Sequence, residues 1–272
     1  MKRQSHSEAE PMRVLAILGS PKKTGTGYKV VQKIETVMKR KGEVEFEYLF
    51  LADANLKQCR GCFLCVSKGE DLCPIKEDRV EIERRIDSAD GIILVSPGYV
   101  QNVSGLMKNF MDRFAYTHHR PKFFDKKVLI VANGGAGLNK VVDALRIAIG
   151  GPEVVAELTY LMLPWPRNAK YERKTEKALV RAAEKFYDSL VAKSDTPSFA
   201  NYMQFRFFKA ISKDVKEWFP ADYEYYKDKN VYYFETKIPA TMKLKAAILM
   251  KIGLLFAKGM GPAPSAKDRR NP

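Results

Sequence analysis

Residues 13–27, RVLAILGSPKKTGTG, give the clearest indication of the fold class. The first six of these residues form a short apolar run with branched side chains, which is typical of a strand buried on both faces of a parallel sheet. The run ends at Gly19, and a loop rich in glycine and hydroxyl groups follows. Residues 30–38 then carry Val, Ile and Met at helical spacing. The stretch therefore predicts a strand, a loop and a helix, the first unit of an α/β sheet.

The same pattern of strand, loop and helix recurs along the chain as far as Pro166. Four further segments are predicted strands: the apolar runs 91–95 and 127–132, residues 44–50, which alternate as expected nearer an edge, and residues 153–161. Helical patterns lie between them, the clearest over residues 103–114. This alternation predicts a doubly wound α/β domain over residues 12–166 with right-handed crossovers, including a cysteine-rich loop at 53–76.

Length and composition limit the class of protein. The chain has 272 residues, of which 46% are hydrophobic and 29% charged, as in folded globular proteins. These values exclude intrinsic disorder and collagen-like repeats. No apolar run reaches the ~20 residues that a membrane span needs. Residues 1–11 are polar and lack the apolar centre of a signal peptide, so we expect a cytoplasmic protein.

The remaining sequence predicts a basic, aromatic-rich, mainly helical extension at 167–258 and a disordered tail at 259–272. Lys and Arg outnumber Asp and Glu by 22 to 12 after residue 166, against 25 to 20 before it. Such a surface attracts phosphate-rich partners or anionic lipid, or it is simply a solvated face. The last helix, 239–258, resembles a basic helix at a membrane surface, and packing on a dimer mate is the alternative. No nucleic-acid motif is present, so nucleic acid is disfavoured.

The first loop, Gly19 to Tyr28, has the composition of a phosphate cradle. Backbone N–H groups at the start of the following helix, together with its dipole, suit a phosphate dianion. Hydroxyl groups and lysines add donors and charge: Ser20, Thr24, Thr26, Lys22 and Lys23. The loop lacks the spacing of a P-loop and of the Rossmann fingerprint. A plain turn that uses glycine for its geometry is the alternative.

The loop after the third strand runs from Ser96 to Gly105. In an open α/β sheet, ligands bind outside the carboxyl ends of the strands, where the strand order reverses. With the order 2-1-3-4-5, this loop and the first loop flank that crevice. A flat ring against Pro97 and Tyr99, with backbone N–H groups of 98–102 at its polar edge, is compatible with a phosphate at the first loop. An ordinary half-buried Tyr99 is the alternative.

All four cysteines lie within fifteen residues, at Cys59, Cys62, Cys65 and Cys73, followed by Pro74. Clustering argues against a disulfide framework. The C-x2-C-x2-C spacing with a remote fourth cysteine resembles the ligand run of a [4Fe–4S] cluster. A redox pair of Cys62 with Cys65 and a zinc site remain alternatives, although zinc fits three closely spaced cysteines poorly. At the end of the predicted helix over residues 103–114, we expect Asp112 and Arg113 to form an ion pair.

Together, three motifs resemble the NADPH-dependent FMN reductase family, and within it the iron-sulfur flavoproteins. These motifs are GSPKKTGTG at 19–27, the cysteine run at 59–73, and ADGIILVSPGY at 89–99, which continues into NVSGLMKNFMDR at 102–113. The resemblance covers about residues 12–165. It implies a flavodoxin-like fold, a doubly wound five-stranded parallel sheet of order 2-1-3-4-5, with a mainly helical C-terminal appendage outside the shared core.

By this resemblance, residues from three loops bind FMN. The phosphate contacts would be Ser20, Lys22, Thr26, Gly27 and Tyr28. The isoalloxazine contacts would be Ser96, Pro97, Gly98, Tyr99, Val100 and Asn102, with Asn133 and Gly134 closing the other side. The four cysteines would be the metal ligands. We assign no catalytic side chain, because the flavin carries the chemistry and the protein positions it.

The resemblance implies an FMN-dependent oxidoreductase that works as a homo-oligomer, a dimer or a tetramer. Electrons would come from NAD(P)H or a reduced ferredoxin-like protein and pass through FMN, with or without a [4Fe–4S] cluster, to an unidentified acceptor. The alternative, from another class, is a non-enzymatic flavodoxin-like binding module. Such a module would dock on membrane lipid or nucleic acid through its basic C-terminal region.

Overall fold

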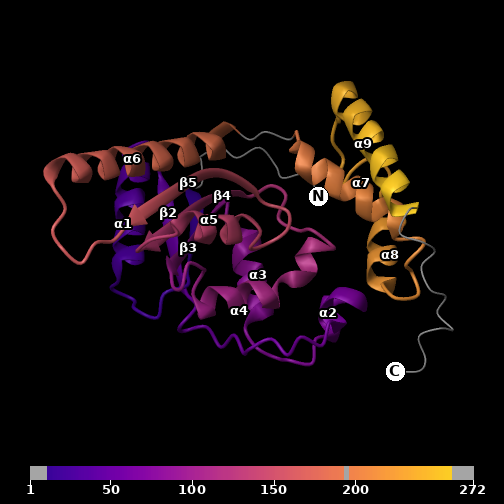
Figure 1. Cartoon of the computed structure of the whole chain (residues 1–272), viewed down its shortest axis with the longest axis horizontal. Coiled ribbons are helices and arrows are strands. Elements are labelled where there is room, and N and C mark those ends of the chain that lie inside the picture. The colour runs from indigo at the N-terminus through magenta and orange to yellow at the C-terminus, as the bar shows by residue number, and fades with distance from the viewer. Residues whose placement is uncertain (1–10, 193–195, 259–272) are drawn as a thin grey trace. The chain divides into compact units, whose positions relative to one another are not determined.

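The computed structural model describes residues 11–192 and 196–258. The chain divides into two compact units, Met1–Ser194 and Asp195–Pro272, which are labelled by element in Figure 1. The tail predicted at 259–272 lies outside the described residues.

The first unit is built on one sheet of five parallel strands in the order β2-β1-β3-β4-β5. The strands are β1 (Met12–Leu18), β2 (Val44–Phe50), β3 (Gly91–Gly98), β4 (Lys127–Gly134) and β5 (Glu153–Leu161). Central strand residues such as Leu15, Ile93 and Leu129 have no exposed surface, as expected of a parallel sheet covered on both faces. The predicted flavodoxin-like fold is confirmed. The strand order reverses at β1, so the loops after β1 and β3 flank the crevice that such sheets use for ligands.

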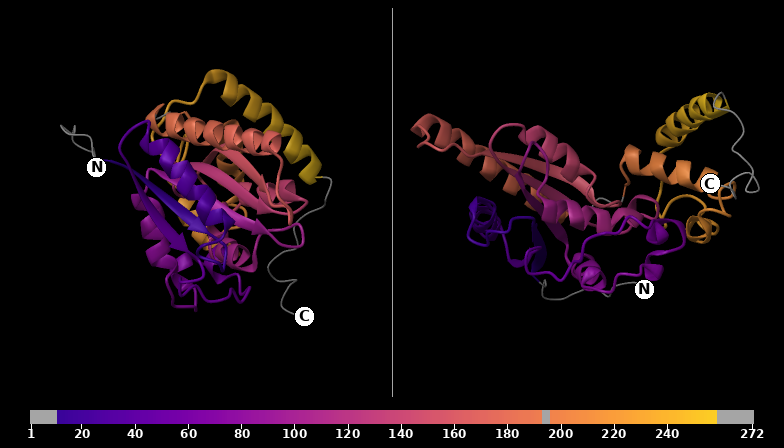
Figure 2. Two further views of the ribbon diagram at one scale, coloured as in Figure 1. Left: turned by 90° about the vertical axis from the view of Figure 1, so that its left-hand side faces the viewer. Right: turned by 60° about the horizontal axis from the view of Figure 1, so that its bottom comes forward.

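Helices cover both faces of this sheet. They are α1 (Thr26–Lys39), α2 (Leu64–Ser67), α3 (Arg79–Ser88), α4 (Gly105–Arg113), α5 (Leu138–Arg146) and α6 (Ala169–Ala192), with short 3-10 turns η1 (Glu70–Leu72) and η2 (Ala115–His118). Figures 1 and 2 show α1 and α6 side by side on one face, and α3, α4 and α5 on the other. The crossovers that connect the strands produce this division.

Helix α6 belongs to the sheet unit, whereas sequence analysis placed residues 167–192 in the extension. Its apolar stripe, which includes Leu179, Ala183 and Phe186, joins one core cluster with the side chains of β1, β3 and β4. Gly91 makes this packing possible, because a Cβ there would stand 2.7 Å from the Phe186 ring. The division between the two units therefore follows α6 rather than preceding it.

The second unit contains α7 (Phe199–Ile211), α8 (Pro220–Tyr226) and α9 (Ala240–Lys258), which confirms the mainly helical C-terminal region. Its core is aromatic and comprises Tyr202, Phe205, Tyr226, Tyr232, Ile238 and Ala246. The ring of Phe205 lies 5.0 Å from that of Tyr233 and 5.6 Å from that of Tyr232, centroid to centroid, in edge-to-face contacts. No helix among the described residues combines the length and the apolar character needed to cross a bilayer.

Candidate functional site

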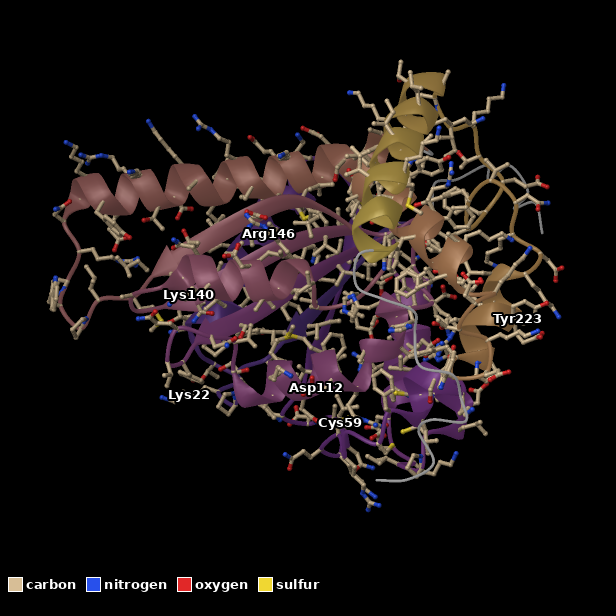
Figure 3. The ribbon with its side chains drawn as sticks, turned by 45° about the vertical axis from the view of Figure 1, so that its right-hand side comes forward. Lys22, Cys59, Asp112, Lys140, Arg146 and Tyr223 are labelled. Carbon is tan, nitrogen blue, oxygen red and sulfur yellow. The ribbon has the colours of Figure 1, made fainter. Side chains whose placement is uncertain are left out.

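The loop between β1 and α1 is a compact turn held by its own hydrogen bonds. The Ser20 hydroxyl accepts from the Lys22 N–H at 3.1 Å and donates to the Lys22 carbonyl at 3.3 Å. The Gly25 N–H donates to the same carbonyl at 3.1 Å. The Lys22 side chain is exposed and projects from the loop (Figure 3). Its ammonium group is therefore free to move toward an anion at the loop.

Helix α1 begins without a capping side chain. Gly25 occupies the N-cap position, and the first helical hydrogen bond runs from the Lys29 N–H to the Gly25 carbonyl. The N–H groups of the first three helical residues, Thr26, Gly27 and Tyr28, have no acceptor within the helix. They point out of the positive end of a 14-residue helix, an arrangement that favours a phosphate.

The β1–α1 and β3–α4 loops are joined by Ser104, the residue before α4. Its hydroxyl donates to the Gly19 carbonyl and accepts from the Met107 N–H at 3.2 Å, so it caps α4 and holds the end of β1. The Gly19 N–H donates to the Val95 carbonyl at 2.8 Å. Sequence analysis did not select Ser104 as a site residue. The available signal was a serine at the N-cap position of a predicted helix.

Asn133, at the end of β4, faces the first turn of α1. A Cβ on Gly27 would stand 3.0 Å from the Asn133 Oδ1 atom, so glycine lets the start of α1 lie close against the Asn133 side chain. The Asn133 side-chain amide donates to the Met162 sulfur at 3.7 Å, while its Oδ1 is buried and has no partner among the described residues. A buried acceptor without a donor costs about 1–3 kcal/mol. This oxygen is therefore suited to a donor group on a bound ligand.

The loop after β3 is a tight turn over residues 99–102. The Tyr99 N–H donates to the Asn102 carbonyl at 2.9 Å, and the Asn102 N–H donates back at 3.0 Å. Val100 and Gln101 have φ angles of 50° and 58°, a region that branched residues such as valine disfavour. Tyr99 is half exposed and Val100 fully exposed. Two of the N–H groups expected at a ring edge are thus used inside the turn, and strain of this kind is typical of ligand-binding loops.

Two other predicted contacts face away from the meeting point of the loops. The Ser96 hydroxyl is buried, where it donates to the Pro97 carbonyl and accepts from the Ser104 N–H, both at 3.0 Å. The Tyr28 ring packs on the edge strand, 5.2 Å from the Tyr48 ring, centroid to centroid. Ser96 thus supports the loop, and Tyr28 offers the site its backbone N–H rather than its ring.

The remaining predicted contacts lie at the carboxyl ends of β3 and β4. Gly98 and Gly134 are register partners in the parallel ladder, and Pro97 is paired with Asn133. The sheet therefore brings together residues that are 36 positions apart in the sequence. The structure places these residues and the start of α1 at one end of the sheet, as the sequence predicted.

The four thiols lie in the long connection between β2 and α3. Cys73 is buried, Cys59 and Cys65 are half-buried, and Cys62 is exposed. Burial raises the pKa of the Cys65 thiol, and the charges of the other three thiols raise it further. Within the described residues, however, no three His, Cys, Asp or Glu side chains converge closely enough to hold a metal ion. The cysteines fit a [4Fe–4S] cluster in kind and number, but not in their present positions.

Side chains from outside the connection hold it in place. Asn109 of α4 accepts from the Cys59 N–H at 3.0 Å and donates to the Leu56 carbonyl at 2.8 Å. Figure 3 shows Cys59 beside this helix, near the labelled Asp112. Arg120, after η2, donates to the carbonyls of Cys65 and Val66 and pairs with Glu70. Sequence analysis did not predict these contacts, since they join residues about 50 positions apart.

Arg113 lies against Cys73. The ion pair with Asp112 that the sequence analysis expected is not formed. The Arg113 guanidinium donates to the Cys73 sulfur at 3.2 Å and forms a buried ion pair with Glu77, while Asp112 pairs with Lys108. Burial alone would raise the pKa of the Cys73 thiol, but the hydrogen bond and charge of Arg113, together with a backbone hydrogen bond from Ile75, outweigh it and lower that pKa. A cation beside a thiol favours the thiolate, the form that binds metals.

A parallel sheet of this topology, with an uncapped helix start at α1 and an unsatisfied side-chain oxygen at the end of β4, defines a protein of the flavodoxin-like class. Residues 12–163 match the NADPH-dependent FMN reductase family over more than half of the chain. The protein belongs to that family.

Several relatives are named iron-sulfur flavoproteins. One from Archaeoglobus fulgidus is 34% identical over 145 residues, which cover 53% of this chain and 59% of the relative. One from Methanocaldococcus jannaschii is 40% identical over 102 residues, covering 38% and 51%. The chain thus spans little more than half the length of these two relatives. A second M. jannaschii protein is 30% identical over 198 residues, covering 67% of this chain and 98% of the relative.

Solved structures support the fold alone. The NAD(P)H:quinone oxidoreductase from Methanothermobacter marburgensis has a TM-score of 0.51 and 17% identity, covering 66% of this chain and 100% of that one. The RosB structure has the same TM-score with 12% identity, covering 84% and 92%.

Proposed function

We propose that this protein is an FMN-dependent oxidoreductase whose flavin binds where the loops after β1, β3 and β4 meet. The observation that carries the proposal is the buried, unpartnered Oδ1 of Asn133, which faces Gly27 at the uncapped start of α1. An acceptor that lacks a donor and an anion site thus lie together at the point where the strand order reverses. Membership of the NADPH-dependent FMN reductase family supports the same ligand.

In this proposal, the backbone N–H groups at the start of α1 bind the phosphate, with help from Ser20 and Lys22. Pro97 and the strained turn at Tyr99 and Val100 flank the ring system, while Asn133 and Gly134 close the opposite side. When bound, FMN supplies the capacity to accept a hydride or single electrons. The chain's own residues bind and orient it, and no acid or base side chain is needed for that role.

We further propose NAD(P)H as the electron donor, with a ferredoxin-like protein as the alternative. The family's name supports a nicotinamide donor. The half-exposed Tyr99 and the fully exposed Val100 leave the turn open to a second planar ligand.

We propose that Cys59, Cys62, Cys65 and Cys73 hold a [4Fe–4S] cluster. Their spacing and the names of the relatives support this assignment. A second support is the buried Nε of Arg113, a donor with no partner in the described part of the chain, beside Cys73. Cluster binding would require the thiols to move closer together than they are here. A thiol redox pair and a zinc site are the competing outcomes.

The first test is the composition of the full-length protein purified without oxygen. We expect a two-banded flavin spectrum with about one FMN per chain, and about four irons with acid-labile sulfide. Flavin without iron would support the oxidoreductase proposal and contradict the cluster proposal. Zinc in place of iron would have the same consequence. Colourless protein that does not take up added FMN would instead favour a non-enzymatic binding module.

A matched pair of glycine variants tests where the flavin binds. Gly27→Ala places a methyl group 3.0 Å from both Asn133 Oδ1 and Val95 Cγ1, whereas Gly105→Ala, in the first turn of α4, meets nothing within 4 Å. We expect Gly27→Ala to weaken FMN affinity about tenfold, or ~1.4 kcal/mol. Gly105→Ala should retain FMN. Equal flavin titration curves for the two variants would contradict an FMN site at the start of α1.

Location and assembly follow as further proposals. All four cysteines are unbridged, which suits a reducing compartment such as the cytoplasm. We also expect a homo-oligomer, which light scattering of the purified full-length protein would detect. A monomeric mass at micromolar concentration would contradict this expectation.

A further inference from the structure

The exposed face of α9 carries an apolar stripe that the flavin site does not explain. Leu244, Ile248 and Ile252 are spaced four residues apart, so they lie along one side of the helix. Their exposed fractions are 64%, 52% and 45%. Burying this much aliphatic surface is favourable by ~25 cal/mol per Å². The stripe therefore has a substantial drive to leave water.

The stripe does not hold α9 in its own unit. That contact is made by the opposite side of the helix, where Ala246 is fully buried and Met242 packs against the aromatic core. Figure 1 shows α9 beside α7, to which this inner side is attached. The helix is thus seated through Ala246 and Met242, whereas Leu244, Ile248 and Ile252 stay on the outside.

Lysines border the stripe on both sides. At about 100° per residue, Lys243 and Lys251 fall on one flank and Lys245 on the other. All three are exposed. No Asp or Glu occurs between Thr236 and Lys267, so this whole segment carries positive charge only. An aliphatic stripe with cationic borders is complementary to a lipid surface, which offers hydrocarbon below a layer of phosphate groups.

We propose that α9 binds in the plane of an anionic lipid surface, with Leu244, Ile248 and Ile252 inserted and the three lysines at the phosphate level. Long lysine side chains reach back to the headgroups while their stems remain in apolar surroundings. Attraction to anionic lipid contributes about 1 kcal/mol per lysine near the surface. The inference goes beyond the proposed flavin chemistry, because it concerns a different unit of the chain.

Two other occupants fit this face less well. A second copy of the chain would bring its own lysines against these, with no acidic residue on α9 to offset them. Nucleic acid would find exposed aliphatic side chains where binders of single strands present aromatic rings for stacking. Charge complementarity therefore favours anionic lipid.

The test uses the full-length, flavin-loaded protein in vesicle flotation. We compare vesicles of phosphatidylcholine alone with vesicles that contain about 30% phosphatidylglycerol, in low salt and in ~0.5 M salt. We expect at least tenfold more protein on the anionic vesicles, with most of it released by high salt. Absence of binding to both vesicle types, or equal binding to both, would overturn the proposal.

Three variants make the test specific. Ile248→Glu should abolish flotation, and a triple change of Lys243, Lys245 and Lys251 to Gln should remove the preference for anionic vesicles. Val80→Glu is the matched control, since Val80 is 63% exposed on α3 of the other unit. It should float like the wild type, and all variants should retain flavin. Flotation of Ile248→Glu at the wild-type level would overturn the proposal.

Two further results would reassign the face. A wild-type dimer that Ile248→Glu converts to monomer, without vesicle binding by either protein, would assign the stripe to a second copy. Binding of a fluorescent oligonucleotide in place of vesicles would assign it to nucleic acid. Either result overturns the lipid proposal.

Discussion

The flavin loops and the cysteine loop lie in the same unit but are positioned by different means. The loops after β1, β3 and β4 continue directly from adjacent strands, so the register of the sheet sets their relative positions. The connection at 51–78 contains no strand, and it is held by side chains that reach it from α4 and from the segment after η2. The flavin site therefore depends on backbone geometry, whereas the cysteine loop depends on a few buried side chains.

The largest expected effect comes from removing the cation beside Cys73. The side chains of Arg113 and Glu77 are 2% and 1% exposed, so Arg113→Met leaves a buried carboxylate without its partner. Such a loss destabilises proteins by about 3–5 kcal/mol. We expect a loss of that size in urea unfolding monitored by circular dichroism.

A double variant provides the control for this prediction. Arg113→Met combined with Glu77→Leu replaces the buried pair by apolar groups, and such replacements are often neutral or stabilising. Most of the lost stability should therefore return. If the double variant is as unstable as Arg113→Met, the guanidinium contributes through packing or through Cys73 rather than through the ion pair.

A smaller effect is expected at Arg120, and it should be confined to the cysteine loop. Arg120→Met removes the hydrogen bonds that the guanidinium donates to two carbonyls of the loop and to Glu70. We expect faster alkylation of the cysteines by iodoacetamide and lower iron content, with flavin retained. Arg60→Met, an exposed change in the same loop, is the control. Loss of flavin in Arg120→Met would show that the two sites are coupled, and it would contradict their being positioned independently.

The converse test is at the flavin loops. Tyr99→Ala should weaken FMN affinity up to about tenfold, since ring contacts of this kind contribute ~0.5–1.5 kcal/mol beyond area burial. Tyr99→Phe should restore the affinity, because the contact depends on the ring and not on the hydroxyl. Cysteine alkylation should not change in either variant. Unchanged flavin content in purified Tyr99→Ala would contradict a contact between Tyr99 and FMN.

The sequence predicted the parts of the molecule that repeat a local pattern. Each strand was identified from a short apolar run, and the strand ends then located the loops at which β1, β3 and β4 meet. Local pattern is less informative on the short helix α3, where the apolar residue Val80 is 63% exposed. A helix of ten residues offers too few positions to fix its buried face.

The side chains that hold the two sites in place could not be predicted from local sequence patterns. Ser104, Arg113 and Arg120 each bond a backbone carbonyl or a thiol 40 to 85 positions away. Every residue has a backbone carbonyl, so the amino-acid sequence does not indicate which carbonyl accepts such a hydrogen bond. Helix α6 was assigned to the extension for a related reason, since its apolar stripe fits a sheet as well as another helix.

The smallest effect concerns pH and the segment that carries Arg120. Burial lowers the pKa of His118, at the end of η2, below its ordinary value of 6.5, and the charge of His119 lowers it further. Below pH 6.5 the unfolded chain therefore binds a proton that the folded chain does not, so the free energy of unfolding falls as the pH drops. The stabilisation is complete above pH 6.5. We expect His118→Asn to flatten this slope by less than about 1 kcal/mol between pH 5 and 7. Urea midpoints of both proteins across that range measure the effect, and parallel curves would mean that His118 takes up its proton equally in both states.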